Sequence, residues 1–82
     1  MSESIAVEAR FEANGTLRPI AFEWKGQRFF IESHGRRWEE NGSQHFLVMV
    51  QGKQVFEIAF LQGENQWQLL RSPQDFNRHS VV

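Results

Sequence analysis

The stretch Ile5–Ile31, IAVEARFEANGTLRPIAFEWKGQRFFI, contains the clearest structural pattern in the chain. Residues 5–13 alternate between apolar side chains and mostly charged ones, which is the period of a β-strand with one buried face. Two polar-glycine pairs, Asn14-Gly15 and Lys25-Gly26, interrupt the apolar segments. Asn-Gly is a strong hairpin signal because both central positions of the turn need positive φ. The stretch therefore predicts two consecutive antiparallel hairpins.

The register of these hairpins follows from two-residue turns at the two polar-glycine pairs. The first turn predicts three cross-strand pairs: Ala9 with Ile20, Val7 with Phe22, and Ile5 with Trp24. The second turn predicts three more: Phe22 with Phe29, Ile20 with Ile31, and Glu23 with Arg28. A slip of one residue would lose both the apolar pairs and the favourable charge pair.

Six glycines recur along the chain at the spacing of a strand plus a turn, and no segment before Ser72 has a helical period. We predict an all-β fold: an antiparallel meander of about six or seven short strands, bent into a small barrel or half-barrel. The expected strands are 4–13, 16–24, 27–33, 36–40, 44–51, 54–61 and 66–71, of which the third and fourth can form one bent strand.

The chain divides into a β-meander domain over residues 1–72 and a C-terminal tail over residues 73–82. The tail begins with SPQDF, in which Ser72 is a candidate N-cap, Pro73 suits the first helical position and Asp75 lies in the first turn. A short C-terminal turn or helix is expected there.

The apolar face changes parity between Ile31 and Trp38. One extra residue near His34-Gly35, a β-bulge, would restore the pattern and bend the sheet. A turn at Asn41-Gly42 then pairs Trp38 with His45. In this interpretation Trp38 closes one end of the core, and Arg37 is a solvated neighbour whose removal changes stability little. A loop over residues 62–65 adds two further pairs, Phe60 with Trp67 and Ile58 with Leu69.

Composition restricts the classes of function. The net charge is −1, which disfavours a general electrostatic affinity for nucleic acid or anionic membrane. The chain has no cysteine and no apolar run long enough for a membrane span, so we expect a cytoplasmic protein without disulfides. Its three histidines have no metal-binding spacing, and no serine lies in a nucleophile motif. We therefore expect no enzyme activity, no metal and no cofactor.

In the predicted register, one face of the sheet is the core and the opposite face also carries apolar side chains. The candidate partner-binding residues on this outer face are Phe30, Phe46, Val48, Val50, Leu61 and Leu70. A solvated face does not normally carry so much apolar area. Either the tail, with Phe76, Val81 and Val82, covers this face, or an unknown protein partner or a second copy of the chain does so.

A second candidate site is basic and aromatic. Arg28, Arg36, Arg37 and Trp38 are the candidate nucleic-acid-binding residues, because arginine and aromatic side chains on a sheet often hold single strands. Glu39 and Glu40 follow directly, and Glu23 is positioned to neutralise Arg28. A core tryptophan between solvated arginines is the simpler interpretation.

The segments RPIAFEWKGQRFFI, RRWEE, QVFEIAF and QWQLLRS together resemble a family of small, functionally uncharacterised bacterial β domains. Similar domains are appended to a Y-family-polymerase-like protein of mutagenic DNA repair, and others stand alone. The resemblance covers residues 18–71, although EENGSQ stands where the family has further tryptophan. The matching positions are Arg18, Pro19, Phe22, Trp24, Gly26, Arg28, Trp38, Phe56, Glu57, Trp67, Leu69 and Arg71.

The favoured function is a non-catalytic protein-interaction or self-association module. The alternative is an accessory nucleic-acid-binding domain associated with DNA repair, as the resemblance implies. A small-ligand binder or enzyme in a barrel mouth ranks last.

Overall fold

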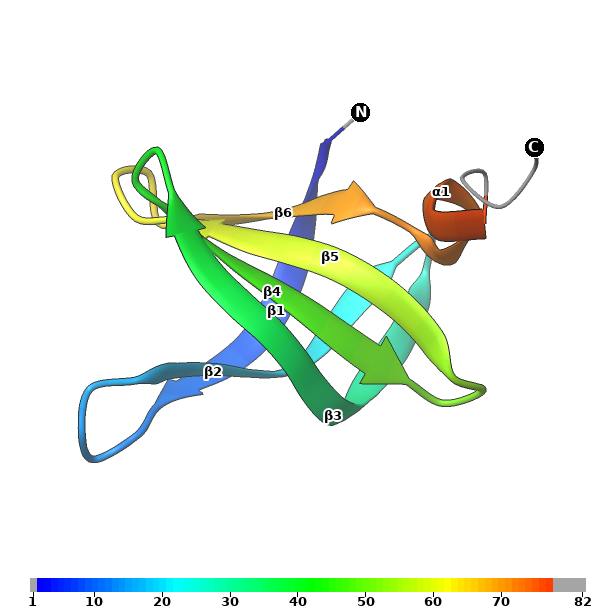
Figure 1. The fold of residues 1–82 in the computed structure, drawn as a ribbon, viewed down its shortest axis with the longest axis horizontal. Coiled ribbons are helices and arrows are strands. Elements are labelled where there is room, and N and C mark those ends of the chain that lie inside the picture. The colour runs from blue at the N-terminus through cyan, green and yellow to red at the C-terminus, as the bar shows by residue number, and fades with distance from the viewer. Residues whose placement is uncertain (1, 78–82) are drawn as a thin grey trace.

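A computed structural model describes residues 2–77 as a closed barrel of six antiparallel strands followed by one short helix (Figure 1). The elements are β1 (Glu3–Phe11), β2 (Leu17–Trp24), β3 (Gln27–Glu40), β4 (Ser43–Val50), β5 (Gln54–Leu61), β6 (Gln66–Arg71) and α1 (Pro73–Asn77). Each strand pairs with the next, and β1 pairs with β6 to close the barrel. The predicted all-β antiparallel barrel is confirmed, and the segments 27–33 and 36–40 form the single bent strand β3.

The first hairpin has the predicted register at the end far from its turn, and a shifted register next to the turn. Val7 pairs with Phe22 as expected, but Ala9 pairs with Pro19 because β2 carries an extra residue at this point. The turn explains the difference, since it has three residues where two were predicted. The Gly15 N–H donates to the Glu12 carbonyl at 2.8 Å, and Gly15 has a φ of 88°, the geometry of a type I turn closed by a glycine bulge.

The second hairpin forms as predicted and then opens. Lys25 and Gly26 both have positive φ, at 52° and 73°, as a type I′ turn requires. The expected pairs of Phe22 with Phe29 and of Glu23 with Arg28 are present. Pairing between β2 and β3 ends at Ala21 and Phe30, so the predicted pair of Ile20 with Ile31 does not form. The predicted pair of Ile5 with Trp24 in the first hairpin is also absent, since β1–β2 pairing begins at Ala6 and Ile5 pairs with Trp67 of β6.

Beyond Phe30, β3 leaves β2 and pairs with β4 (Figure 1). Two register shifts bend it, one between Ile31 and Ser33 and one between His34 and Arg37. The second is the predicted bulge at His34-Gly35, and the first was not predicted. A Cβ at Gly35 would be in ordinary van der Waals contact with the Leu47 carbonyl oxygen, at 3.4 Å, so the bend leaves room for a side chain there.

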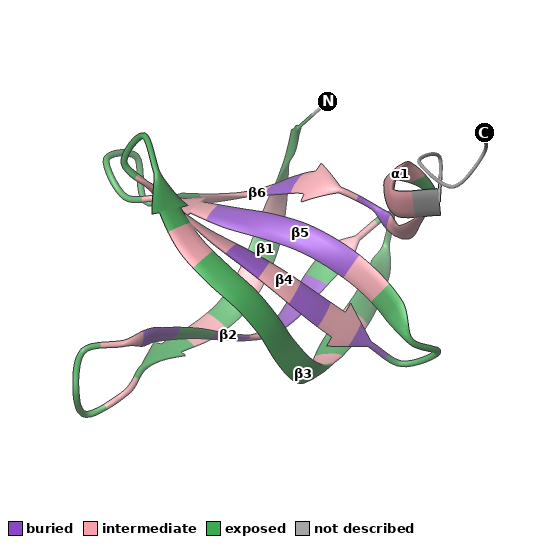
Figure 2. Ribbon diagram, in the orientation of Figure 1, coloured by how far each residue is buried: buried purple, intermediate pink, exposed green. Residues whose placement is uncertain are grey.

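The unpredicted bulge between Ile31 and Ser33 reverses the predicted orientation of β4. β3 carries two extra residues, and their effects on the direction of the side chains beyond them cancel. Trp38 and Ile31 therefore lie on opposite faces of the sheet, and the even-numbered side chains of β4 point inward. Phe46, Val48 and Val50, predicted on the outer face, are buried in the barrel core. Figure 2 shows the buried segments running along the middle of β4 and β5. The core contains Leu17, Phe22, Phe46, Val48, Val50, Phe56, Ile58 and Leu69.

The C-terminal segment forms the predicted helix start. The Ser72 backbone N–H and hydroxyl both donate to Asp75 Oδ2, at 2.8 and 3.2 Å, so the Asp75 carboxylate caps the first turn, with Pro73 at the first helical position. α1 ends at Asn77. Val81 and Val82, predicted as part of a cover for the sheet, lie outside the described residues.

Two side chains of β3 bridge the gap to β2 where backbone pairing stops. His34 Nε2 donates to the Pro19 carbonyl at 2.8 Å, and an Arg37 guanidinium N–H donates to the Leu17 carbonyl at 2.8 Å. The Arg37 guanidinium also lies 4.8 Å from the centre of the Phe46 ring. Arg37 is exposed, as predicted for a solvated neighbour, but its hydrogen bond to Leu17 and its contact with Phe46 were not predicted.

We predict that Arg37→Ala lowers the free energy of unfolding by about 1.5–2 kcal/mol, because it removes a charged donor from a backbone carbonyl and a cation from the Phe46 ring. Arg18→Ala is the matched control, since Arg18 is exposed on β2, and it should change stability by less than about 0.5 kcal/mol. Urea denaturation measures both variants. Equal effects would show that the bridge is not a structural link.

Candidate interaction surface

The candidate nucleic-acid-binding residues do not meet on one surface. Arg28 lies on the β2–β3 hairpin, where it forms ion pairs with Glu8 and Glu23. Arg37 points toward β2 and the barrel core. Arg36 and Trp38 remain together, with the Arg36 guanidinium 5.3 Å from the centre of the Trp38 ring.

The candidate partner-binding residues are also separated. Phe46, Val48 and Val50 belong to the core and are not available to a partner. Leu61 and Leu70 are half-buried on β5 and β6. Phe30 is 62% exposed beside the β2–β3 hairpin, where the Arg28 guanidinium lies 5.1 Å from the ring centre. The broad apolar outer face expected from the sequence is absent from the described part of the chain.

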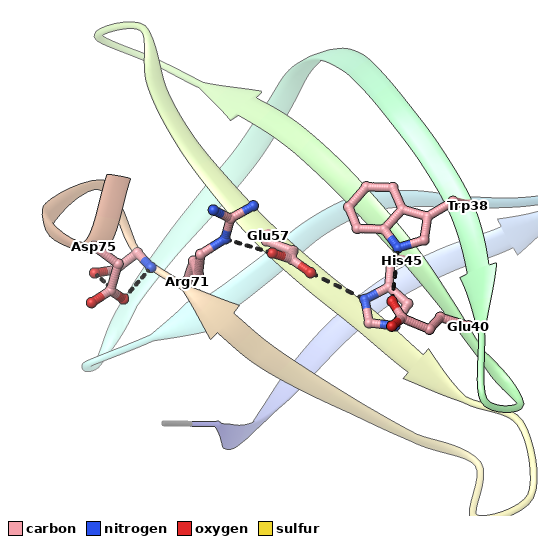
Figure 3. Close-up of polar contacts among 7 residues, drawn as sticks. Trp38, Glu40, His45, Glu57, Arg71 and Asp75 are labelled. Carbon is pink, nitrogen blue, oxygen red and sulfur yellow. Dashed lines mark hydrogen bonds and ion pairs between the residues drawn. The ribbon is translucent and has the colours of Figure 1, made fainter. Parts of the chain in front are cut away.

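A polar network on the outer side of β4, β5 and β6 is the most organised feature of the surface (Figure 3). At its centre is Glu57, which is 7% exposed. Its Oε1 accepts from Arg71 Nε at 2.7 Å, and its Oε2 lies 3.1 Å from His45 Nδ1. Arg71 reaches this position because Leu70 is an extra residue in β6, which places Arg71 opposite Glu57. We call Glu57, Arg71 and His45 the Glu57 network.

The Glu57 network supports a half-exposed tryptophan. The His45 ring stacks on Trp38 with centroids 5.1 Å apart and an interplanar angle of 10°. Trp38 Nε1 donates to Glu40 Oε1 at 3.3 Å. The predicted pairing of Trp38 with His45 is confirmed, but the prediction that Trp38 belongs to the core is wrong, because the pair lies on the outer face of the sheet.

Beside Trp38, the structure forms an open cleft of about 550 Å³. One wall is the loop between β1 and β2 with the start of β2, Gly15–Leu17, and the other comes from the ends of β3 and β4. Arg37, Glu39 and Gln44 add polar groups of both charge signs to the second wall.

The Glu57 network is better suited to holding the Trp38 side chain in place than to catalysis. A histidine oriented by a carboxylate resembles part of a general-base site, but catalysis also needs a nucleophile or a bound substrate within reach. His45 lies under Trp38 and does not line the cleft beside Trp38. Within residues 2–77, no three histidine or acidic side chains are placed to hold a metal ion.

Comparison of the chain with protein families, with curated proteins and with solved structures found no match. The described chain contains no helix with the length and apolar character needed to span a membrane.

Glu57 and Arg71 were not predicted as site residues, although both are among the positions on which the family resemblance rests. A usable signal exists in QVFEIAF, where one glutamate interrupts an apolar strand. A carboxylate in such a position needs a hydrogen-bonded partner, because burying an unpaired charge is unfavourable. The partners could not be identified from sequence, since Arg71 faces Glu57 only through the bulge at Leu70.

We predict that Glu57→Gln lowers the free energy of unfolding by about 1.5–3 kcal/mol, because the neutral amide loses the charge-assisted bond to Arg71. Glu64→Gln, in the exposed loop between β5 and β6, is the matched control and should have an effect below about 0.5 kcal/mol. Chemical denaturation followed by circular dichroism measures both. Wild-type stability in the Glu57 variant would contradict a supporting role for the network.

The orientation of β4 gives a further prediction. Phe46→Ala should lower stability by about 3–5 kcal/mol because it opens a cavity in the core. Trp38→Ala should lower it by about 1–2 kcal/mol, because a half-exposed ring loses only part of its contacts. Thermal unfolding of the two variants compares them directly. The opposite order would restore the interpretation that places Trp38 in the core.

Proposed function

We propose that this domain is a non-catalytic protein-interaction module that binds a partner through Trp38, Arg36 and the adjoining cleft. The observation that carries the proposal is Trp38 itself, which is half-buried on the outer face of the sheet and held by stacking on His45. Tryptophan and arginine are the residues most enriched at binding hot spots. A side chain that is already ordered loses less conformational freedom when a partner binds.

The Glu57 network supports this proposal because it explains why Trp38 is ordered. Glu57 is fixed from one side by Arg71, and it fixes the His45 ring from the other. The Arg71 guanidinium lies 4.2 Å from the centre of the Phe76 ring, so the order extends to α1. Buried polar groups of this kind are stable only when all of them are paired.

The alternative function is an accessory nucleic-acid-binding domain associated with DNA repair, as the family resemblance suggests. One observation favours it, because Arg36 and Trp38 share a surface and could contact a phosphate and a base. Three observations oppose it: Glu39 and Glu40 lie beside this pair, Arg28 is neutralised elsewhere, and the indole ring already contacts His45 and Arg36. We therefore favour a protein partner.

The test uses the full chain as immobilised bait in native lysate, compared with Trp38→Ala and Arg36→Glu baits. We expect a protein partner that the wild type retains and that both variants lose by about tenfold or more, as hot-spot truncations do. Lys53→Glu, in the exposed β4–β5 turn, is the matched charge control and should retain it.

A parallel measurement of fluorescence anisotropy, with a labelled single-stranded oligonucleotide at several salt concentrations, tests the alternative. Salt-dependent binding that both variants lose would replace the protein partner with nucleic acid. If neither assay distinguishes the wild type from the variants, Trp38 is not a binding residue and both proposals fail.

A further inference from the structure

The first strand has an edge without a partner strand. β1 pairs with β6 over Glu3–Ile5 and with β2 over Ala6–Phe11. Among the described elements, only β2 and β6 lie next to β1. Past Ile5, one edge of β1 therefore faces no other strand, and Figure 1 shows the β1–β2 hairpin projecting from the barrel.

The backbone groups of this free edge can be assigned from the turn. The Glu12 N–H donates to the Thr16 carbonyl, so Glu12 points its backbone groups toward β2. Successive residues of a strand point their backbone N–H and C=O groups in alternate directions. The backbone groups of Val7, Ala9 and Phe11 therefore point away from β2. An unpaired row of this kind is a template for another strand.

The side chains on this edge also lack cover. Phe11 is 69% exposed at the end of β1, the most exposed large apolar side chain among the described residues. It lies on the same face as Val7 and Ala9, which pack against the core. On the opposite face, Glu8 and Arg10 alternate and are both exposed.

These charges select one register for pairing with an identical strand. If two β1 edges meet antiparallel with Ala9 facing its own copy, Glu8 of each chain faces Arg10 of the other, and Val7 faces Phe11. A shift of two residues in either direction brings Glu8 opposite Glu8 or Arg10 opposite Arg10. Opposite charges across a strand pair are favourable and like charges are unfavourable.

We propose that the chain forms a symmetric dimer by antiparallel pairing of the free β1 edges about Ala9. The occupant of the edge is a second copy, because the pattern of Glu8 and Arg10 is complementary to itself, as a two-fold interface requires. The pairing also covers Phe11 with Val7 of the other chain. It is independent of the surface around Trp38 and of the function proposed above.

The present partners of the two charged residues are compatible with this pairing. Arg10 Nε lies 3.6 Å from Glu12 Oε2, and the Arg10 side chain is well exposed, so this ion pair is weak. Glu8 accepts a hydrogen bond from Arg28 through Oε1. Its second carboxylate oxygen can accept from Arg10 of the other chain, since a carboxylate accommodates several donors.

The test uses charge reversal in the full chain, with mass measured by sedimentation velocity over a concentration series. The wild type should dimerise as concentration rises. Arg10→Glu and Glu8→Arg should each weaken self-association by about tenfold or more, because like charges then face each other twice. An equal mixture of the two variants should recover a dimer, since each supplies the charges that the other needs.

Three controls separate this proposal from other effects. Circular dichroism must show that both charge variants are folded, and Lys53→Glu should dimerise like the wild type. Trp38→Ala should also dimerise normally, so that failure of the proposed function and failure of this dimer are distinguishable. A monomeric wild type at all concentrations, a dimer unchanged in both variants, or a mixture that stays monomeric would each overturn the proposal.

Discussion

The barrel depends on a missing hydrogen-bond donor at Pro19, whose backbone nitrogen carries no hydrogen. Pairing between β2 and β3 ends at Ala21 and Phe30, two residues before Pro19 would join the ladder. A strand that cannot continue with one neighbour is free to turn toward another, and β3 does so by pairing with β4. A single residue therefore explains why β3 is shared between two sides of the barrel.

The gap that results is closed by side chains. The carbonyls of Leu17 and Pro19 would otherwise lack partners on the β3 side, and unpaired backbone groups near a core are unfavourable. Arg37 and His34 supply the donors. A partner strand could bind at this edge only by displacing both side chains. No other described strand supplies side-chain donors of this kind to the free edge of β1. This edge is therefore the better candidate for pairing between chains.

The sequence was sufficient for most local features of this fold, the length of the Asn14-Gly15 turn being an exception, and insufficient for one global feature. Hairpins at Lys25-Gly26 and Asn41-Gly42 were predictable because turn residues specify their own geometry. The orientation of β4 was not, because it depends on the number of bulges between Ile31 and Trp38, and each bulge reverses every side chain beyond it. One bulge left a sequence signal at His34-Gly35, whereas the other, next to Glu32, left none. The candidate site failed for the same reason, since Trp38 and His45 were paired correctly but assigned to the wrong face.

The number of bulges in β3 decides both which side chains fill the core and which lie on the surface. With two bulges in β3, Phe46, Val48 and Val50 fill the barrel while Trp38 and His45 lie outside it, next to Glu57. With one bulge in β3, Trp38 and His45 would lie in the barrel, and Phe46, Val48 and Val50 would lie outside it. Glu57 would then lose its contact with the His45 ring. Selection for a filled core therefore also maintains Trp38 at the surface, because neither arrangement can change without the other. A small domain with one layer of core can in this way hold a half-buried aromatic side chain on its outer face without a separate structural element to support it.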